Sequence, residues 1–217
     1  GNVGKDWLAG LAPSTDGAPL KSMAGPHVCP GGKGQHATPA CWLPIDQVDA
    51  RHIHTIQAGD VLPAGQTQVS YINAFLGEFG LKFGQSKTIQ LPGVKLPVAI
   101  SDKLYLDKRT NTYKITKYGR ERYVKLLART ILNPWEIWMS PATVAGKTVS
   151  VLNLFRLYQD SNGKLGGFAA FRLYDGGRSW QGATVFMPKG NETQIMKYLE
   201  KQRLEMNRSG VLLYREP

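Results

Sequence analysis

The chain has 217 residues, of which 42% are hydrophobic and 20% charged, and its formal net charge is +11. This composition supplies enough apolar material for a packed core and argues against wholesale disorder. No stretch approaches the roughly 20 consecutive apolar residues that a membrane-spanning helix requires, so we expect no membrane span.

The basic residues are concentrated in the C-terminal two thirds of the chain. Residues 1–69 carry four Lys or Arg and five Asp or Glu, whereas residues 70–217 carry 23 and 11. The stretch from Lys103 to Arg129 holds nine basic residues and two acidic ones. Because such a concentration of charge attracts polyanions, we expect a polyanionic partner. A solvated basic face that merely keeps the protein soluble would have the same composition.

Histidine and cysteine are confined to the first quarter of the chain. They occupy six positions before residue 55: His27, Cys29, His36, Cys41, His52 and His54. Their spacing lacks the paired pattern of zinc sites, so we predict no metal and no cofactor. The two cysteines either form a disulfide or stay as thiols. Residues 70–217 contain no imidazole for use as a general base, so we expect other side chains to supply the chemistry there.

Taken in chain order, residues 1–69 are predicted to form an irregular extension or cap. Residues 1–45 contain eight glycines and six prolines, which interrupt regular structure. Residues 51–56 alternate between polar and apolar side chains and predict a short edge strand.

Residues 70–217 show a regular pattern of helices and strands. Apolar residues at helical spacing predict a helix that begins after Ser70, as N-cap, and ends at Gly80. Two short strands are expected at 88–91 and 98–100. A second helix is predicted over 119–132, and Asn133–Pro134 stops it because a residue before proline avoids the helical conformation.

Four strands and a last helix complete the predicted domain. The strands are expected at 136–140, 149–159, 168–174 and 183–187, with Gly-containing turns between them. A helix over 192–207 and a short strand over 211–214 follow. The predicted fold class is α+β, in which helices precede a four-stranded antiparallel sheet and a C-terminal helix.

Five segments in a fixed order make this pattern more specific. They are AFLGEFG (74–80), LPVAISDKLYLD (96–107), KITKYGRERYVKLLARTILNPWEIW (114–138), RSWQGATVF (178–186) and SGVLLYRE (209–216). Together they resemble the phage-type branch of the barnase–EndoU–colicin–RelE-like nucleases, found at the C-termini of phage head-morphogenesis proteins and in bacterial polymorphic toxins. The resemblance covers about residues 70–217. It implies a barnase- or RelE-like fold and metal-independent ribonuclease activity.

The helix start and the first sheet strand supply candidate catalytic residues. Lys117, Arg120 and Arg122 lie where backbone N–H groups also attract an anion, so they are expected to hold the RNA phosphate, with Lys117 and Arg122 in catalytic roles. Glu136 lies between two tryptophans at the head of the strand. Partial desolvation should raise its pKa and make it the general base. The alternative is a structural ion pair with Arg122 or Arg156.

The sheet supplies the remaining candidates. Arg156, Arg172 and Thr184 lie on three successive predicted strands and would form a cationic, hydroxyl-bearing patch if they share a face. Thr184 is then a candidate hydrogen-bond donor in catalysis, and the two arginines would bind RNA. Trp180 and Tyr214 are candidates for stacking on bases, although large aromatic residues also serve in cores.

The sequence therefore predicts a ribonuclease-type toxin, secreted or delivered by a phage, that acts on RNA such as tRNA in the cytoplasm of a target bacterium. An acidic immunity protein is the expected protein partner, because complementary charge favours its capture. A non-catalytic nucleic-acid-binding or structural module of a phage head is the alternative, and an RNA- or nucleotide-modifying transferase is a weaker one.

Overall fold

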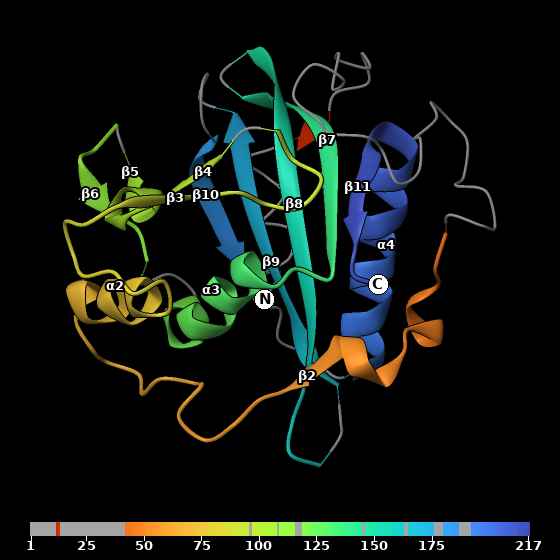
Figure 1. Ribbon diagram of the computed structural model, residues 1–217, viewed down its shortest axis with the longest axis horizontal. Coiled ribbons are helices and arrows are strands. Elements are labelled where there is room, and N and C mark those ends of the chain that lie inside the picture. Colours follow the sequence, from red (N-terminus) through yellow and green to blue (C-terminus); the bar gives the residue numbers. More distant parts are fainter. Residues whose placement is uncertain are drawn as a thin grey trace.

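A computed structural model describes residues 12–13, 42–95, 97–107, 109–115, 119–144, 146–162, 165–175, 180–186 and 192–217 (Figure 1). Lys117, Cys29 and Cys41 lie outside the described residues. The described part contains three α-helices: α2 (Gln68–Gly77), α3 (Val124–Leu132) and α4 (Glu192–Ser209). The α+β class predicted from the sequence is confirmed.

Four long strands form the centre of the sheet. They are β7 (Glu136–Val144), β8 (Lys147–Gln159), β9 (Leu165–Asp175) and β10 (Trp180–Phe186). Each is antiparallel to the next, at the positions that the sequence predicts. These strands are joined by short connections, which favour antiparallel pairing.

Further strands make the complete sheet mixed, so the prediction of a purely antiparallel sheet was wrong. Strands β2 (Ile53–Thr55) and β4 (Val98–Ile100) run parallel to β8 and β10, respectively. Both lie far from their partners in the chain, and parallel pairing requires such long connections. The antiparallel pairs are β3 (Lys87–Ile89) with β4, and both β1 (Ala12–Pro13) and β11 (Val211–Arg215) with β7. Strand β11 follows α4 at the position of the short strand predicted over 211–214.

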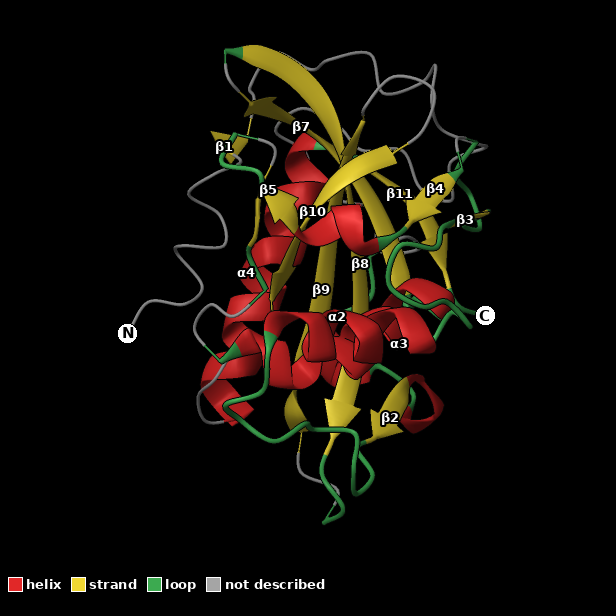
Figure 2. Ribbon diagram, turned by 90° about the vertical axis from the view of Figure 1, so that its left-hand side faces the viewer, coloured by secondary structure: helices red, strands yellow, loops and turns green. Residues whose placement is uncertain are grey.

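Helices cover the two faces of this sheet, and the core is correspondingly divided. Side chains of α2 and α3 pack with Leu152, Leu154 and Tyr158 of β8. Leu199 and Met206 of α4 pack with Phe155 and Leu157, which point to the opposite face. Figure 1 shows the long strands between α4 and the α2–α3 pair, and Figure 2 shows α2 and α3 in front of these strands. Strand β8 is therefore buried on both faces.

Local hydrogen bonds define the helix starts. Thr67, rather than the predicted Ser70, caps α2, because its side chain accepts a hydrogen bond from the Ser70 backbone N–H. The second predicted helix begins with a 3-10 turn (Arg120–Tyr123) and becomes α-helical at Val124. A two-stranded ribbon of β5 (Leu106–Asp107) and β6 (Thr112–Tyr113) precedes it, after the 3-10 turn Asp102–Tyr105.

The segment from residue 42 to residue 69 packs onto the sheet and its helices. Its 3-10 turns, Ile45–Gln47 and Ala50–His52, lead into β2, which confirms the predicted short strand at 51–56. Ile45 and Trp42 belong to the core beneath α4, and Ile56 and Leu62 pack against the core beneath α3. Residues 42–69 thus reach the end of the sheet where β7 begins.

The join between α4 and β11 generates a prediction. A Cβ atom added to Gly210 would lie 2.1 Å from the Met139 carbonyl oxygen, whereas one added to Gly77 would meet nothing within 4 Å. We therefore expect Gly210→Ala to lower the free energy of unfolding by about 1–3 kcal/mol. Gly77→Ala, the matched control, should leave it unchanged or raise it by up to about 1 kcal/mol. Urea denaturation measures both, and equal midpoints would contradict this close packing.

Candidate active site

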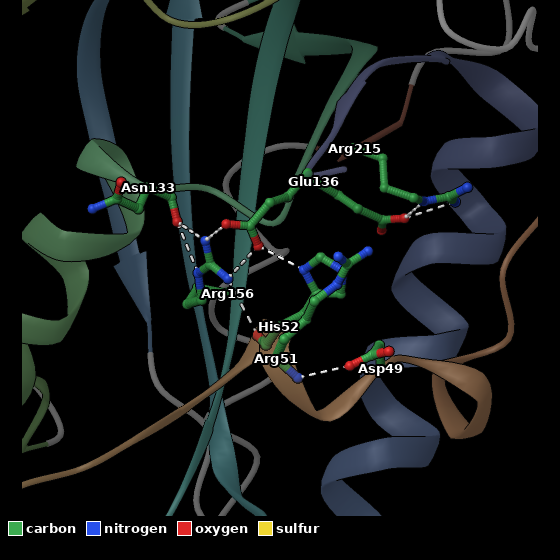
Figure 3. A network of polar contacts seen from close by, with 8 residues as sticks. Asp49, Arg51, His52, Asn133, Glu136, Arg156 and Arg215 are labelled. Carbon is green, nitrogen blue, oxygen red and sulfur yellow. Dashed lines mark hydrogen bonds and ion pairs between the residues drawn. The ribbon is translucent and has the colours of Figure 1, made fainter.

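Several distant segments converge where β7 begins (Figure 3). The C-terminal end of α3 contributes Asn133, and the turn before β2 contributes His52. Strand β8 contributes Arg156, and Glu216 follows β11. All of these residues meet in one network of hydrogen bonds and ion pairs.

Arg156 is the centre of this network. Its side chain is fully buried and forms two hydrogen bonds with Glu216, of 2.8 Å from Nη1 and 3.1 Å from Nη2. Its Nε and Nη2 atoms also donate to the Asn133 carbonyl oxygen, and Nη1 donates to that of His52. Arg156 thus caps the C-terminus of α3, where a cation is stabilised by the helix dipole. With its donors occupied inside the protein, Arg156 does not fit the predicted role in RNA binding.

Glu216 orients His52. The His52 Nδ1 atom lies 2.7 Å from a Glu216 carboxylate oxygen, and the Arg51 Nε atom donates to His52 Nε2 at 3.2 Å. Because Nε2 accepts a hydrogen bond from Arg51, the imidazole proton lies on Nδ1, which donates to Glu216. Burial opposes ionisation of Glu216, but hydrogen bonds from Arg156 and His52 outweigh it and lower the pKa of Glu216 to about 2. The carboxylate is therefore charged throughout the physiological range.

His54 lies beside this charged pair and is partly exposed. Strand β2 pairs it with Tyr158, whose ring it meets edge-on at a centroid distance of 6.2 Å. Burial and the positive charge of Arg156 lower the pKa of His54, and the opposing charge of Glu216 does not overcome them. His54 is thus a neutral imidazole at pH 7, which is the form that accepts a proton.

Tyr214 approaches the same pair from β11. It is partly exposed, and burial followed by the negative charge of Glu216 raises its pKa. Its phenol therefore remains protonated at neutral pH and can donate a proton. The network thus presents a proton acceptor and a proton donor, both within the electrostatic field of Arg156 and Glu216.

Glu136 is buried in an ion-pair cluster of its own. Arg203 of α4 approaches its two oxygens at 2.7 and 2.9 Å, and Arg215 approaches one of them at 2.8 Å. The Trp138 indole N–H also donates to it at 3.0 Å. Burial alone would raise the pKa of Glu136, but the two arginines and Trp138 lower it. The predicted rise in pKa was therefore wrong, and the alternative of a structural ion pair holds with different arginine partners.

Two tryptophans enclose the guanidinium of Arg203. Its Cζ atom lies 4.5 Å from the centroid of Trp42 and 4.8 Å from that of Trp135. Arg203 also forms an ion pair with Glu200 at 2.5 Å. Cation–π contacts stabilise a buried guanidinium that has lost its water. Arg203 thus links α4, the start of β7 and the segment that begins at Trp42.

The predicted phosphate cradle at residues 117–122 has a different arrangement. Arg122 donates from Nε to the Leu62 carbonyl oxygen at 2.8 Å, and its own carbonyl accepts from the Leu62 N–H. Arg122 therefore holds the loop after β2 against the start of α3. Arg120 is partly exposed and lies close enough to Tyr105 to oppose the rise in its pKa. The role of Lys117, outside the described residues, stays a prediction.

The predicted patch on the sheet is only partly reproduced by the strand register. Thr184 is the direct partner of Arg172, and Arg172 is the partner of Asn153 on β8. These three residues therefore occupy one cross-strand row. Arg156 lies three positions from Asn153 and so belongs to the opposite face. Trp180 is the partner of Asp175 and Val98 at the other end of β10. The roles of Arg172, Thr184 and Trp180 stay predictions.

The most informative residues of the network come from outside the segments that carry the sequence motifs. His52 and His54 belong to the N-terminal segment, and the pairing of β2 with β8 brings them against residues 70–217, whose own sequence contains no histidine. The sequence feature that pointed to the two histidines was their spacing of two in a segment of alternating polar and apolar residues. No sequence feature pointed to Arg203 apart from its position in a predicted helix.

A family comparison agrees with this architecture. Residues 74–215 match the family described as phage-Barnase-EndoU-ColicinE5/D-RelE like nuclease 2. The chain belongs to this family, which confirms the predicted resemblance and indicates a nuclease. His52, His54 and Glu216 lie outside the matched range. No curated protein and no solved structure matches the chain.

Within the described residues, the helices are too short or too polar to span a membrane.

The Glu136 cluster generates a stability prediction. Glu136→Gln removes the buried negative charge and leaves Arg203 and Arg215 without their shared counter-charge. Breaking a buried pair in this way costs about 3–5 kcal/mol. Chemical denaturation should show this loss. The control is Glu205→Gln, which breaks the ion pair between Glu205 and Arg208. These two side chains are 44% and 49% exposed, so the loss of the pair should lower the free energy of unfolding by less than about 1 kcal/mol. Equal losses in the two variants would refute the structural role of Glu136.

His54 generates a pH prediction. Its pKa is lowered in the folded protein, so between the folded value and about 6.5 the unfolded chain binds more protons. Stability should therefore be highest above pH 6.5 and fall as the pH drops through the folded pKa. His54→Gln should flatten this part of the curve, as measured by unfolding at a series of pH values. An unchanged slope in the variant would show that His54 is not the group responsible.

Proposed function

We propose that this protein is a metal-independent ribonuclease that cleaves RNA by acid–base catalysis, with His54 as base and Tyr214 as acid. One observation carries the proposal: in a member of a nuclease-like family, the charges of Arg156 and Glu216 act on both His54, whose pKa is lowered, and Tyr214, whose pKa is raised. The two groups have the protonation states that such catalysis needs at neutral pH.

The chemistry requires two proton transfers and one displacement at phosphorus. His54 accepts the proton of the 2′-hydroxyl as the 2′-oxygen attacks the phosphorus. The bond to the 5′-oxygen breaks, and Tyr214 protonates that leaving oxygen. The products are a 2′,3′-cyclic phosphate and a 5′-hydroxyl end. Proton exchange with water then returns both side chains to their starting states.

Arg51 is the cation that best fits the developing negative charge. It is exposed, and its Nε atom is held by His52, whose ring Glu216 orients. Among the described residues, none bonds to its terminal nitrogens. Arg156, in contrast, holds the scaffold. A positioned cation stabilises the transition state electrostatically. Lys117, Arg172 and Thr184 remain candidates for further phosphate contacts.

We also propose a biological setting: the protein acts as a toxin on RNA in the cytoplasm of a bacterial cell, after secretion or delivery by a phage. An acidic immunity protein would protect the producing cell, since opposite charge accelerates capture of a basic protein. Expression without such a partner should arrest growth of a bacterial host.

Cleavage of total RNA in the presence of EDTA tests the catalytic proposal. His54→Gln should reduce the rate by about 10²–10⁴, the usual contribution of a general base. Tyr214→Phe should also reduce it. The controls are Thr55→Ala, next to His54 on β2, and Tyr123→Phe, which removes a phenol elsewhere. Both should cleave at the parent rate.

Three outcomes would contradict this proposal. Activity that disappears with EDTA and returns with a divalent ion would replace acid–base catalysis by metal catalysis. Full activity of His54→Gln would remove His54 from the mechanism. RNA binding without any cleavage would favour the non-catalytic nucleic-acid-binding module.

A further inference from the structure

We propose that residues 81–114, which we call the basic lobe, form a binding surface for single-stranded RNA that adjoins the cleavage site. This inference rests on the proposed ribonuclease function and identifies where the substrate docks. The lobe contains β3, β4, β5 and β6 and lies at the far edge of the sheet (Figure 1). Strand β3 lies four strand spacings, about 20 Å, from β8. The loop after β3 returns to β11, where a Cβ atom added to Gly93 would lie 2.3 Å from the carbonyl oxygen of Leu213, the residue before Tyr214.

The lobe has a large excess of positive charge. Its sequence contains seven Lys or Arg and two Asp. Neither aspartate neutralises the surface fully, because Asp102 is buried and accepts a hydrogen bond from Tyr113, and Asp107 pairs with Lys114. The exposed cations without an ion-pair partner among the described carboxylates are Lys82, Lys87, Lys95, Lys103 and Arg109.

Cations elsewhere in the basic part of the chain are used differently. Arg129 bonds to Asp60 and Glu78, both at 2.8 Å, and Arg122 bonds to a carbonyl oxygen. Arg156, Arg203 and Arg215 are paired with carboxylates. Some of the basic residues between Lys103 and Arg129 are therefore bonded to other groups of the protein. Two residues of this stretch, Lys103 and Arg109, are exposed and have no ion-pair partner among the described carboxylates, and both lie on the basic lobe.

An exposed aromatic ring gives the lobe a second feature of single-strand binding. Phe83 is 37% exposed, although its ring packs edge-on against Tyr113 at 5.5 Å. Its backbone N–H donates to Asn73, and the neighbouring Lys82 N–H donates to Gln85, so hydrogen bonds hold this turn. Exposed aromatic rings between cations allow bases to stack while phosphates pair with lysines.

Single-stranded RNA fits these features better than an acidic protein does. An acidic protein could form ion pairs with the lysines, but its binding would not depend on an exposed aromatic ring among them. Lys87 on β3 would also protect a sheet edge from pairing with other chains. That protective role predicts no loss of RNA affinity when the charge is removed.

Binding of a fluorescent 20-nucleotide oligouridylate to the full chain tests the proposal. The lobe variant carries Lys82→Gln, Lys87→Gln and Lys103→Gln. The matched control carries Lys147→Gln, Lys197→Gln and Lys201→Gln, at exposed positions outside the lobe. Fluorescence anisotropy over a range of salt concentrations gives the slope of log affinity against log salt. Three lost phosphate contacts should reduce its magnitude by about 2 in the lobe variant. The control should keep the parent slope.

The stacking part of the proposal has its own test. Phe83→Ala should weaken binding by about 5- to 150-fold, the cost of losing one stacked base. Phe83→Trp, which keeps an aromatic ring at this position, should bind with the affinity of the parent protein. Thermal unfolding of each variant confirms that the folded protein is compared.

Cleavage of a dinucleoside monophosphate separates this inference from the proposed function, because so short a substrate reaches only the cleavage site. The lobe variant should cleave it at the parent rate. If the parent itself does not cleave it, the ribonuclease proposal fails while the binding result still decides the lobe. Equal slopes for the lobe and control variants would overturn the lobe proposal. Tighter binding of a poly-glutamate peptide than of oligouridylate would also overturn it, in favour of a protein partner.

Discussion

The buried charge of Glu136 is the constraint on which much of the structure depends. It is completely enclosed, yet it stays ionised because Arg203 and Arg215 lie on either side of it. A buried carboxylate requires such partners, and any movement of α4 or β11 would leave one of three charges uncompensated. The two tryptophans around Arg203 extend this requirement to the segment that begins at Trp42.

The position of the proposed catalytic groups follows from that constraint. Arg215 pairs with Glu136 in the ladder between β11 and β7, so the next residue, Glu216, is delivered to Arg156. The same carboxylate binds His52, which precedes β2 and therefore His54. One ion-pair cluster orders the scaffold, and a second, more exposed one adjoins the proposed catalytic groups.

The sequence predicts the elements of this fold better than it predicts the site. Alternation and turn residues locate β7 to β10, and apolar spacing locates α3 and α4, because these signals are local. The partners of Glu136 depend on the packing of α4 and β11, more than 60 residues away, and have no local signal. For that reason the sequence predicted a raised pKa for Glu136, whereas its arginine partners lower it. The pairing of β2 with β8 moves His54 into the domain, and only the three-dimensional structure reveals it.

The central claim is that side chains alone perform transesterification at this end of the sheet. The chemical nature of the RNA ends tests it most directly. Purified protein should be incubated with total RNA in EDTA, and the new termini should be identified by mass spectrometry. The account predicts 2′,3′-cyclic phosphate and 5′-hydroxyl ends. Termini with 5′-phosphate and 3′-hydroxyl groups would contradict it, because attack by water, rather than by the 2′-hydroxyl, produces them.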